Sequence, residues 1–365
     1  MPLAAENPCL ALGYRRSSPQ TTRHLGNAGE SYLIYDLSSL DPFLFDETTV
    51  EIAINPDGCV WVERAGDAVM ARTDLMLTTD QVNDLAGIIA NKQQLSLTDE
   101  QPAISTTIEY GGITLRCQAI VRPAAAVGPT LSFRIFRRRP GGAEPRRFAF
   151  LRDQSVSLEQ ERHEKLAHIQ YLAVTSPDPD DFLRECIKER MNILISGGTS
   201  AGKTELGRRL LWMVTEWERL VLIEDSSELL PAQPNLVGLL ADRIRDSERS
   251  ADKLLEMTLR LRPDRIILGE LRGTEALTFL EAINTGHEGS FTTIHATTAR
   301  KAINRLAFLV LRSGLPLTLT EISRYISDSI DVIIQTGRIG ERRGILETYF
   351  PALEENSVDK QQRGN

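Results

Sequence analysis

The stretch Asn192-Ile193-Leu194-Ile195-Ser196-Gly197-Gly198-Thr199-Ser200-Ala201-Gly202-Lys203-Thr204 decides the fold of this chain. Its first five residues are mainly apolar, as expected of a buried strand, and residues 205–214 continue with helical character. The segment from Gly197 to Thr204 fits the pattern G-x-x-x-x-G-K-[ST]. Small residues let such a loop curl, so that its N–H groups and the helix N-terminus converge on phosphate oxygens. The stretch therefore predicts a strand, a phosphate-binding loop and a helix.

Two side chains of this loop have predicted roles. Lys203 is expected to reach the β- and γ-phosphates of a nucleotide, and the Thr204 hydroxyl is expected to bind Mg²⁺. The loop specifies a nucleoside triphosphate and a metal ion. It does not specify what the hydrolysis drives.

Acidic residues follow two further apolar strands. The run at 220–223 ends in Glu224-Asp225-Ser226-Ser227-Glu228, and the run at 265–268 ends in Gly269-Glu270. Ligands of parallel sheets sit where strands end, so these carboxylates can hold the Mg²⁺ hydration shell or polarise the attacking water. Two histidines, His287 and His295, flank one more short β-rich run, although a single histidine is usually a structural group.

Short apolar strands alternate with helical stretches from Phe182 to about Phe350, which predicts an α/β domain with a mostly parallel sheet over 182–350. Upstream, residues 31–136 predict an α+β domain. It contains a hairpin at 50–62 and a helix over Val82–Ile89 with Thr79 or Asp80 as its cap. Residues 1–30 are expected to form a flexible arm, 137–181 a linker and 351–365 a flexible tail.

The composition excludes several classes of protein. The 365 residues carry 42 Lys and Arg against 50 Asp and Glu, and the net charge of -8 gives no overall basic field for nucleic acid. No apolar run is long enough to span a membrane, and the four cysteines form no C-x-x-C pair, so a cytoplasmic protein with reduced thiols is expected. Seven arginines between Arg134 and Arg152 are read as a solvated connector or as a phosphate-facing or subunit-facing patch.

Four motifs in order carry a family likeness. They are Gly197 to Thr204, the acidic segment 223–229, the segment Leu261 to Arg272, and the histidine segment Gly286 to Ala296. With them, the chain resembles the hexameric secretion ATPases, and among these the type IV secretion and conjugative transfer branch.

The resemblance implies a RecA-like carboxy-terminal ATPase domain and a hexameric ring that hydrolyses ATP with Mg²⁺. It implies further that the ring powers export or assembly of a type IV secretion system, as a cytoplasmic protein peripheral to the inner membrane and bound to inner-membrane secretion proteins. Nucleic acid is not an expected partner. Arg116 and Arg134 from the amino-terminal domain, and Arg272 from the sheet, are implied to approach the nucleotide, because the arginine fork suits phosphate oxygens. Glu205 departs from the small residue common after the loop, and a helix N-terminus tolerates its carboxylate if it points to solvent.

The catalytic assignment leaves rivals. Glu270 is the preferred base for the water, Glu224 and Glu228 are alternatives, and Thr204, Glu224 and Glu270 are the expected metal ligands. His295 is implied to sense phosphate. Other functions that stay open are a pilus retraction, pilus extension or type II secretion ATPase, a nucleic-acid motor, and a nucleotide-gated assembly protein with negligible turnover.

Overall fold

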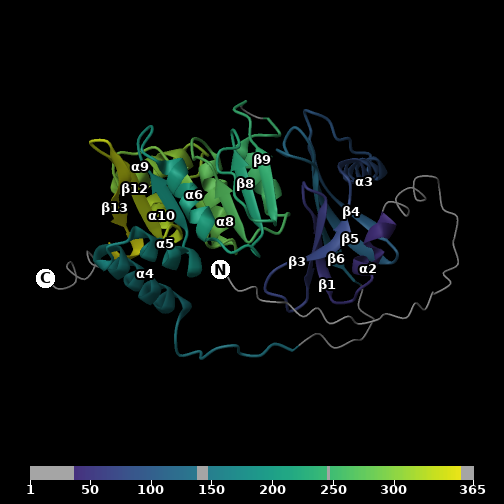
Figure 1. The fold of residues 1–365 in the computed structure, drawn as a ribbon, viewed down its shortest axis with the longest axis horizontal. Coiled ribbons are helices and arrows are strands. Elements are labelled where there is room, and N and C mark those ends of the chain that lie inside the picture. The colour runs from purple at the N-terminus through teal and green to yellow at the C-terminus, as the bar shows by residue number, and fades with distance from the viewer. Residues whose placement is uncertain (1–36, 138–146, 245–246, 355–365) are drawn as a thin grey trace, which may run out of the picture.

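The computed structural model describes residues 37–137, 147–244 and 247–354, and these form two domains that lie side by side along the longest axis (Figure 1). Each domain has its own sheet and its own hydrophobic core. The amino-terminal domain mixes helices with an antiparallel sheet, and the carboxy-terminal domain is α/β. The fold class expected from the sequence is confirmed.

The amino-terminal domain is built on six antiparallel strands in the order β3-β2-β1-β6-β5-β4. Its elements are η1 (Ser38–Leu40), α2 (Asp41–Leu44), β1 (Thr49–Ile54), β2 (Cys59–Arg64), β3 (Ala71–Met76), α3 (Thr79–Lys92), β4 (Ala103–Tyr110), β5 (Ile113–Ile120) and β6 (Thr130–Phe136). The predicted hairpin is β1 and β2, which pair in antiparallel register with Ile54 opposite Val60. Helix α3 covers the sheet with Val82, Leu85, Ala86 and Ile89 buried, as the helical spacing predicted.

Both predicted caps of α3 were wrong, by one residue for Thr79 and by two for Asp80. Thr78, not Thr79 or Asp80, is the N-cap, and its side chain accepts a hydrogen bond from the N–H of Gln81. The Gln81 side chain accepts in return from the N–H of Thr78 at 2.8 Å. This reciprocal capping box satisfies two donors at the helix start, which a cap at either later residue would not do.

The carboxy-terminal domain has seven strands in the order β13-β12-β7-β11-β10-β8-β9, all parallel except the β12–β13 pair. They are β7 (Ile193–Ser196), β8 (Leu220–Glu224), β9 (Leu236–Leu240), β10 (Arg265–Leu268), β11 (Phe291–Ile294), β12 (Val332–Ile339) and β13 (Arg342–Tyr349). The central strands are buried on both faces and so are nearly continuously apolar.

Helices cover both faces of this sheet. Residues of α7 (Ala251–Thr258), α8 (Glu275–Asn284), α9 (Ala299–Leu311) and α10 (Leu319–Ser329) share one core with Val221, Ile266 and Ile294. Residues of α4 (Leu158–Thr175), α5 (Pro179–Lys188) and α6 (Lys203–Met213) share the other core with the alternate strand residues, such as Leu222 and Ile267. The phosphate-binding motif follows β7, a central strand, and therefore lies between the two helical layers at the carboxyl ends of the parallel strands. This side of the sheet is called the carboxyl edge, and the side where the parallel strands begin is called the amino edge.

The interval 137–181, expected as a linker, contains helix α4, whose Leu166 and Ile169 pack into the carboxy-terminal core. Residues 351–354 of the expected tail are helical, and Leu353 packs against the same core. The expected arm and the rest of the expected tail lie outside the described residues.

A buried arginine joins the two domains. Arg219 Nη1 donates to Asn55 Oδ1 at 2.5 Å and to Asn235 Oδ1 at 2.6 Å, and burial lowers the pKa of Arg219 to about 10. Ala125 forms an antiparallel bridge with Leu239 of β9, and Arg262 pairs with Glu63 at 2.5 Å. The amino-terminal domain is therefore docked at the β9 end of the seven-stranded sheet (Figure 1).

Candidate functional site

The loop from Gly197 to Thr204 has the shape that its sequence predicted. A Cβ on Gly197 would stand 2.4 Å from the Thr336 hydroxyl oxygen, so a side chain cannot fit there. Gly202 has a φ of 96° and is the N-cap of α6, a left-handed conformation that glycine adopts without strain. The loop therefore turns directly from β7 into the N-terminus of α6, where helical N–H groups favour an anion.

A cavity of about 420 Å³, here named the carboxyl-edge cavity, opens beside this loop. It is lined by residues that follow β8, β10 and β11 as well as by the loop and α6. Nine residues predicted for the site line it: Thr199, Ser200, Lys203, Thr204, Glu224, Glu228, Glu270, Arg272 and His295. The structure thus brings together motifs that are up to 96 positions apart in the chain, from Thr199 to His295.

A continuous line of polar contacts crosses the cavity. Lys203 Nζ donates to the carbonyl oxygens of Gly197 and Gly198, both at 3.1 Å, and lies 3.2 Å from His295 Nδ1. His295 Nε2 lies 3.1 Å from Glu270 Oε1. Glu270 Oε2 in turn accepts from Arg272 at 2.6 Å. Lys203 is therefore linked to Glu270 through His295.

The acids after β8 organise the opposite wall of the cavity. Glu224 Oε1 accepts hydrogen bonds from the N–H groups of Glu228 and Leu229, both at 3.1 Å. Glu228 Oε2 accepts from the Thr204 hydroxyl at 3.4 Å. Glu224 thereby fixes the turn that brings Glu228 to Thr204.

Burial and charge shift three of these groups. Burial lowers the pKa of Lys203, against the opposing effect of Glu270. Burial raises the pKa of Glu224, because it disfavours the charged carboxylate, although the two N–H donors to this carboxylate oppose the shift. The hydrogen bond to Glu270 raises the pKa of Arg272, so this guanidinium stays charged. Lys203 and Glu224 are therefore partly shielded from water, so their charges interact more strongly than in bulk water.

Three predicted residues lie elsewhere. The Glu205 side chain is 78% exposed and pairs with Arg208 on α6, so its carboxylate points to solvent as the helix N-terminus allows. Arg116 and Arg134 line a second cavity of about 390 Å³, here named the amino-edge cavity, which also contains Arg260 and Arg262. This cavity lies between the domains, next to the residues that precede β7, β10 and β11.

Sequence reasoning missed two charged residues of the carboxyl-edge cavity as site residues. Asp225 accepts from Arg272 at 2.6 Å and from Arg243 at 3.0 Å. Asp225 stands within the acidic segment after β8, so its position next to Glu224 was a usable signal. Arg243 belongs to no motif and reaches the cavity only because β9 lies beside β8.

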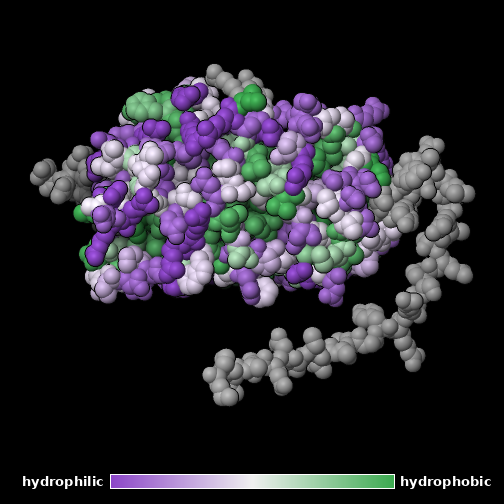
Figure 2. Space-filling model, turned by 45° about the horizontal axis from the view of Figure 1, so that its top comes forward, coloured by the Kyte–Doolittle hydropathy of each residue, from purple (hydrophilic) through white to green (hydrophobic). Residues whose placement is uncertain are grey.

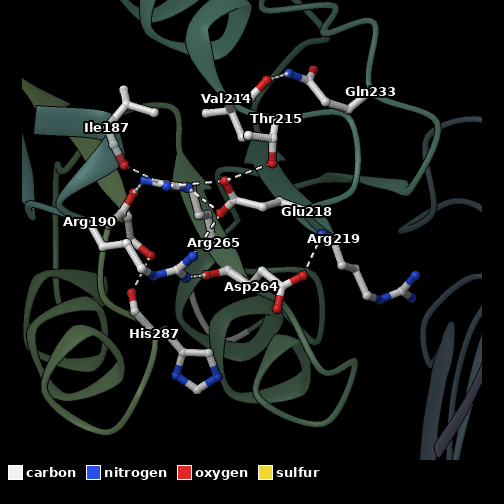
Figure 3. Close-up of polar contacts among 12 residues, drawn as sticks. Ile187, Arg190, Val214, Thr215, Glu218, Arg219, Gln233, Asp264, Arg265 and His287 are labelled. Atoms are coloured by element: carbon white, nitrogen blue, oxygen red, sulfur yellow. Dashed lines mark hydrogen bonds and ion pairs between the residues drawn. The ribbon is translucent and has the colours of Figure 1, made fainter. Parts of the chain in front are cut away.

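The opposite edge of the sheet carries a buried polar cluster (Figure 3). Arg265 donates to Glu218 at 2.7 Å and to the carbonyl oxygens of Gly289 and Ile187, and Arg190 donates to Glu218 at 2.8 Å. Burial by itself raises the pKa of Glu218, but the hydrogen bonds and charge of Arg265, together with the charge of Arg190, hold it below its usual value. His287 lies beside this cluster, where burial lowers the pKa of its imidazole. The two histidines of the segment Gly286 to Ala296 thus lie at opposite edges of the sheet.

Several arginines of the stretch 134–152 are used within the chain. Arg137 donates to the carbonyl oxygens of Thr49, Leu44 and Asp46, and Arg152 pairs with Glu161 at 3.0 Å. Arg138, Arg139 and Arg146 lie outside the described residues.

On the face shown in Figure 2, apolar patches alternate with hydrophilic side chains.

None of the helices within 37–137, 147–244 and 247–354 combines the length and apolar character needed to cross a membrane.

Comparison with known proteins gives consistent matches. Residues 153–339 match the family described as Type II/IV secretion system protein. Conjugal transfer protein TrbB of Rhizobium radiobacter is 34% identical over 91% of this chain and 90% of its own length. Type IV secretion system protein VirB11 of Bartonella quintana is 30% identical over 93% of this chain and 98% of its own length.

A solved structure agrees over most of the chain. The crystal structure of the VirB11 ATPase from the Brucella Suis type IV secretion system, in complex with sulphate, covers 91% of this chain and 98% of that chain. The TM-score is 0.76 at 27% sequence identity. These matches confirm the resemblance drawn from the four motifs. The chain belongs to the type II/IV secretion system protein family and is, within it, a secretion ATPase of the type IV secretion and conjugal transfer branch.

Proposed function

We propose that this ATPase is a Mg²⁺-dependent hexameric motor, which drives export or assembly at the cytoplasmic side of a type IV secretion system in the inner membrane. The observation that carries the proposal is the carboxyl-edge cavity, which joins Lys203 and Thr204 of the loop to the acids after β8 and β10. A triphosphate there would meet N–H donors, a cation and carboxylates within one space of about 420 Å³.

The donor set of the cavity fits Mg²⁺. The Thr204 hydroxyl and the carboxylates of Glu224 and Glu270 are hard oxygen ligands, and Mg²⁺ in nucleotide sites takes few protein oxygens beside phosphate and water. When bound, Mg²⁺ neutralises charge on the phosphate oxygens. Glu228 supports this arrangement, because it holds the Thr204 hydroxyl at 3.4 Å.

Glu270 is the proposed base for the attacking water. Glu224 Oε1 is occupied by two backbone N–H donors, whereas the described contacts of the Glu270 carboxylate are with the side chains of His295 and Arg272. His295 lies between Lys203 and Glu270 and is proposed to couple phosphate binding at the loop to the base. Arg272 is proposed to balance the charge that develops on the phosphate oxygens.

Arg116 and Arg134 are proposed to act on the nucleotide across a domain or subunit boundary. In the single chain they line the amino-edge cavity, not the cavity beside the loop. They can therefore reach a nucleotide only through a domain movement or in a neighbouring copy of a ring.

The Lys203→Ala variant tests the proposed site. Phosphate release from ATP is expected to fall to background, because the variant loses the cation that holds the β- and γ-phosphates. Thermal unfolding is expected to be unchanged, since Lys203 bonds only loop carbonyls and a histidine. Glu205→Gln is the matched control, because Glu205 points to solvent from the same helical turn. Turnover at the wild-type rate in Lys203→Ala would refute the site.

A further inference from the structure

An open groove along the outward side of α9, here named the α9 groove, carries positive charge that is only partly compensated. It has a volume of about 610 Å³, and the described residues that line it include no acid and four cations, Arg272, Lys301, Arg305 and Arg312. Within the described part of the chain, the last three have no ion pair or hydrogen bond through their side chains. Phe308, 58% exposed, lies one helical turn from Arg305 and from Arg312 on the same side of the helix.

A second groove of similar size carries the opposite charge. Among the residues that the structure describes, four acids and one cation line this acidic groove of about 630 Å³: Asp99, Glu100, Asp242 and Glu248, with Arg249. Arg249 pairs with Asp242 at 3.2 Å, whereas Asp99 and Glu100 have no ion pair among the described residues. Ile244, 68% exposed, supplies an apolar side chain here, as Phe308 does in the α9 groove.

Both grooves lie at the carboxyl edge of the seven-stranded sheet, where the parallel strands end, but one is near the outermost strand β9 and the other is toward the outermost strand β13. The acidic groove contains residues that follow β9, the last strand at the end where the amino-terminal domain is docked. Helix α9 begins after β11 and is tied to β13, the last strand at the other end, by the hydrogen bond from Ala299 N–H to Glu347. Figure 1 shows α9 and β9 apart along the long axis. The two grooves therefore lie at separate places on the surface of one chain.

We propose that the surface around the α9 groove of one copy packs against the surface around the acidic groove of a second copy. The two surfaces carry opposite charge, and each exposes an apolar side chain, Phe308 on one and Ile244 on the other. Because each copy presents both surfaces at different places, the contact is head-to-tail and can repeat around a closed ring. The inference deepens the proposed motor function, on which its ring rests, by naming the surfaces that build the ring.

The α9 groove adjoins the carboxyl-edge cavity. Arg272 and His295 line both this groove and the carboxyl-edge cavity. An acidic partner seated against α9 therefore approaches the arginine that contacts Glu270, and assembly acts directly on the groups proposed for hydrolysis. Turnover should consequently depend on protein concentration, whereas nucleotide binding by the single chain should not.

A charge-swap experiment tests the contact in the full-length chain. One variant carries Arg305→Glu with Arg312→Glu, and the other carries Asp99→Lys with Glu100→Lys. Each alone is expected to need an about 100-fold higher protein concentration to assemble, because like charges then face each other across the contact. An equimolar mixture is expected to assemble like the wild type, since every contact in an alternating ring again joins opposite charges. Lys188→Glu, an exposed change on the other face of the sheet, is the control and should assemble normally.

Sedimentation velocity with ATP and Mg²⁺ reads assembly, and calorimetry reads nucleotide uptake by each variant. Loss of assembly in both variants, rescue by mixing and unchanged nucleotide uptake support the contact. Normal assembly of either variant alone, a wild type that stays monomeric, or a mixture that stays monomeric while both variants are folded, overturns it. If the wild type takes up no nucleotide, the proposed function fails, while assembly and its rescue still report on the contact.

Discussion

The two edges of the seven-stranded sheet both concentrate charged residues, but they treat these charges differently. At the amino edge, Arg265 is 2% exposed and its guanidinium is fully engaged with Glu218 and two carbonyl oxygens. At the carboxyl edge, the Arg272 side chain is 46% exposed and shares the acids Glu270 and Asp225 with other partners. The difference teaches that a cluster of charged residues does not by itself mark a ligand site. A ligand site needs charged groups that are exposed and whose present partners a ligand can replace.

The largest effect is expected at the carboxyl edge. Glu270→Gln keeps the shape of the side chain but removes the base, so turnover should fall by about 10²- to 10⁴-fold. Nucleotide uptake by calorimetry and thermal unfolding should both stay near the wild-type values. A variant with unchanged phosphate release would move the role of base to Glu224 or Glu228.

The next effect is expected at the amino edge and concerns stability. Arg265→Ala leaves Glu218 buried without its principal partner, which typically costs about 3–5 kcal/mol of unfolding free energy. Denaturant unfolding measures this loss. Arg184→Ala, at an exposed arginine of α5, is the control and should change the unfolding free energy by about 1 kcal/mol or less. Equal losses in the two variants would mean that the amino-edge cluster is not structurally special.

The sequence predicted the features that depend on neighbouring residues. The loop at 197–204, the hairpin at 50–62 and the α3 face follow from local pattern, and each lies where it was expected. The four motifs also predicted which strand ends would meet, because carboxyl ends of parallel strands share one edge.

Other features depend on contacts that no local pattern encodes. The cavity that Arg116 and Arg134 line is set by how the domains dock, and that docking rests on contacts such as Asn55 with Arg219, 164 positions apart. Helix α4 was hidden within an expected linker, because only Leu166 and Ile169 of its residues are buried and its apolar spacing is weak.

A smaller effect is expected at the boundary between the two domains, where the buried Arg219 lies. Asn55→Ala removes one of the acceptors of the buried Arg219 guanidinium and should cost about 1–3 kcal/mol of unfolding free energy. Denaturant unfolding again provides the measurement, with Asn91→Ala, at an exposed residue of α3, as the control. If both changes cost the same, the Arg219 contact would not hold the domains together.

The smallest effect is the pH dependence of stability that Glu218 supplies. Burial by itself raises the pKa of Glu218, but the hydrogen bonds and charge of Arg265 and the charge of Arg190 hold it below the ordinary value of 4.5. The unfolded chain then takes up this proton first as the pH falls, so the stabilisation is complete above pH 4.5 and is lost below it. Denaturant unfolding across this range should show a smaller loss of stability on acidification in Glu218→Gln than in the wild type. An identical slope in the two proteins would show that the amino-edge pair does not remain ionised in the way its buried contacts require, and the contrast between the two edges would lose its electrostatic basis.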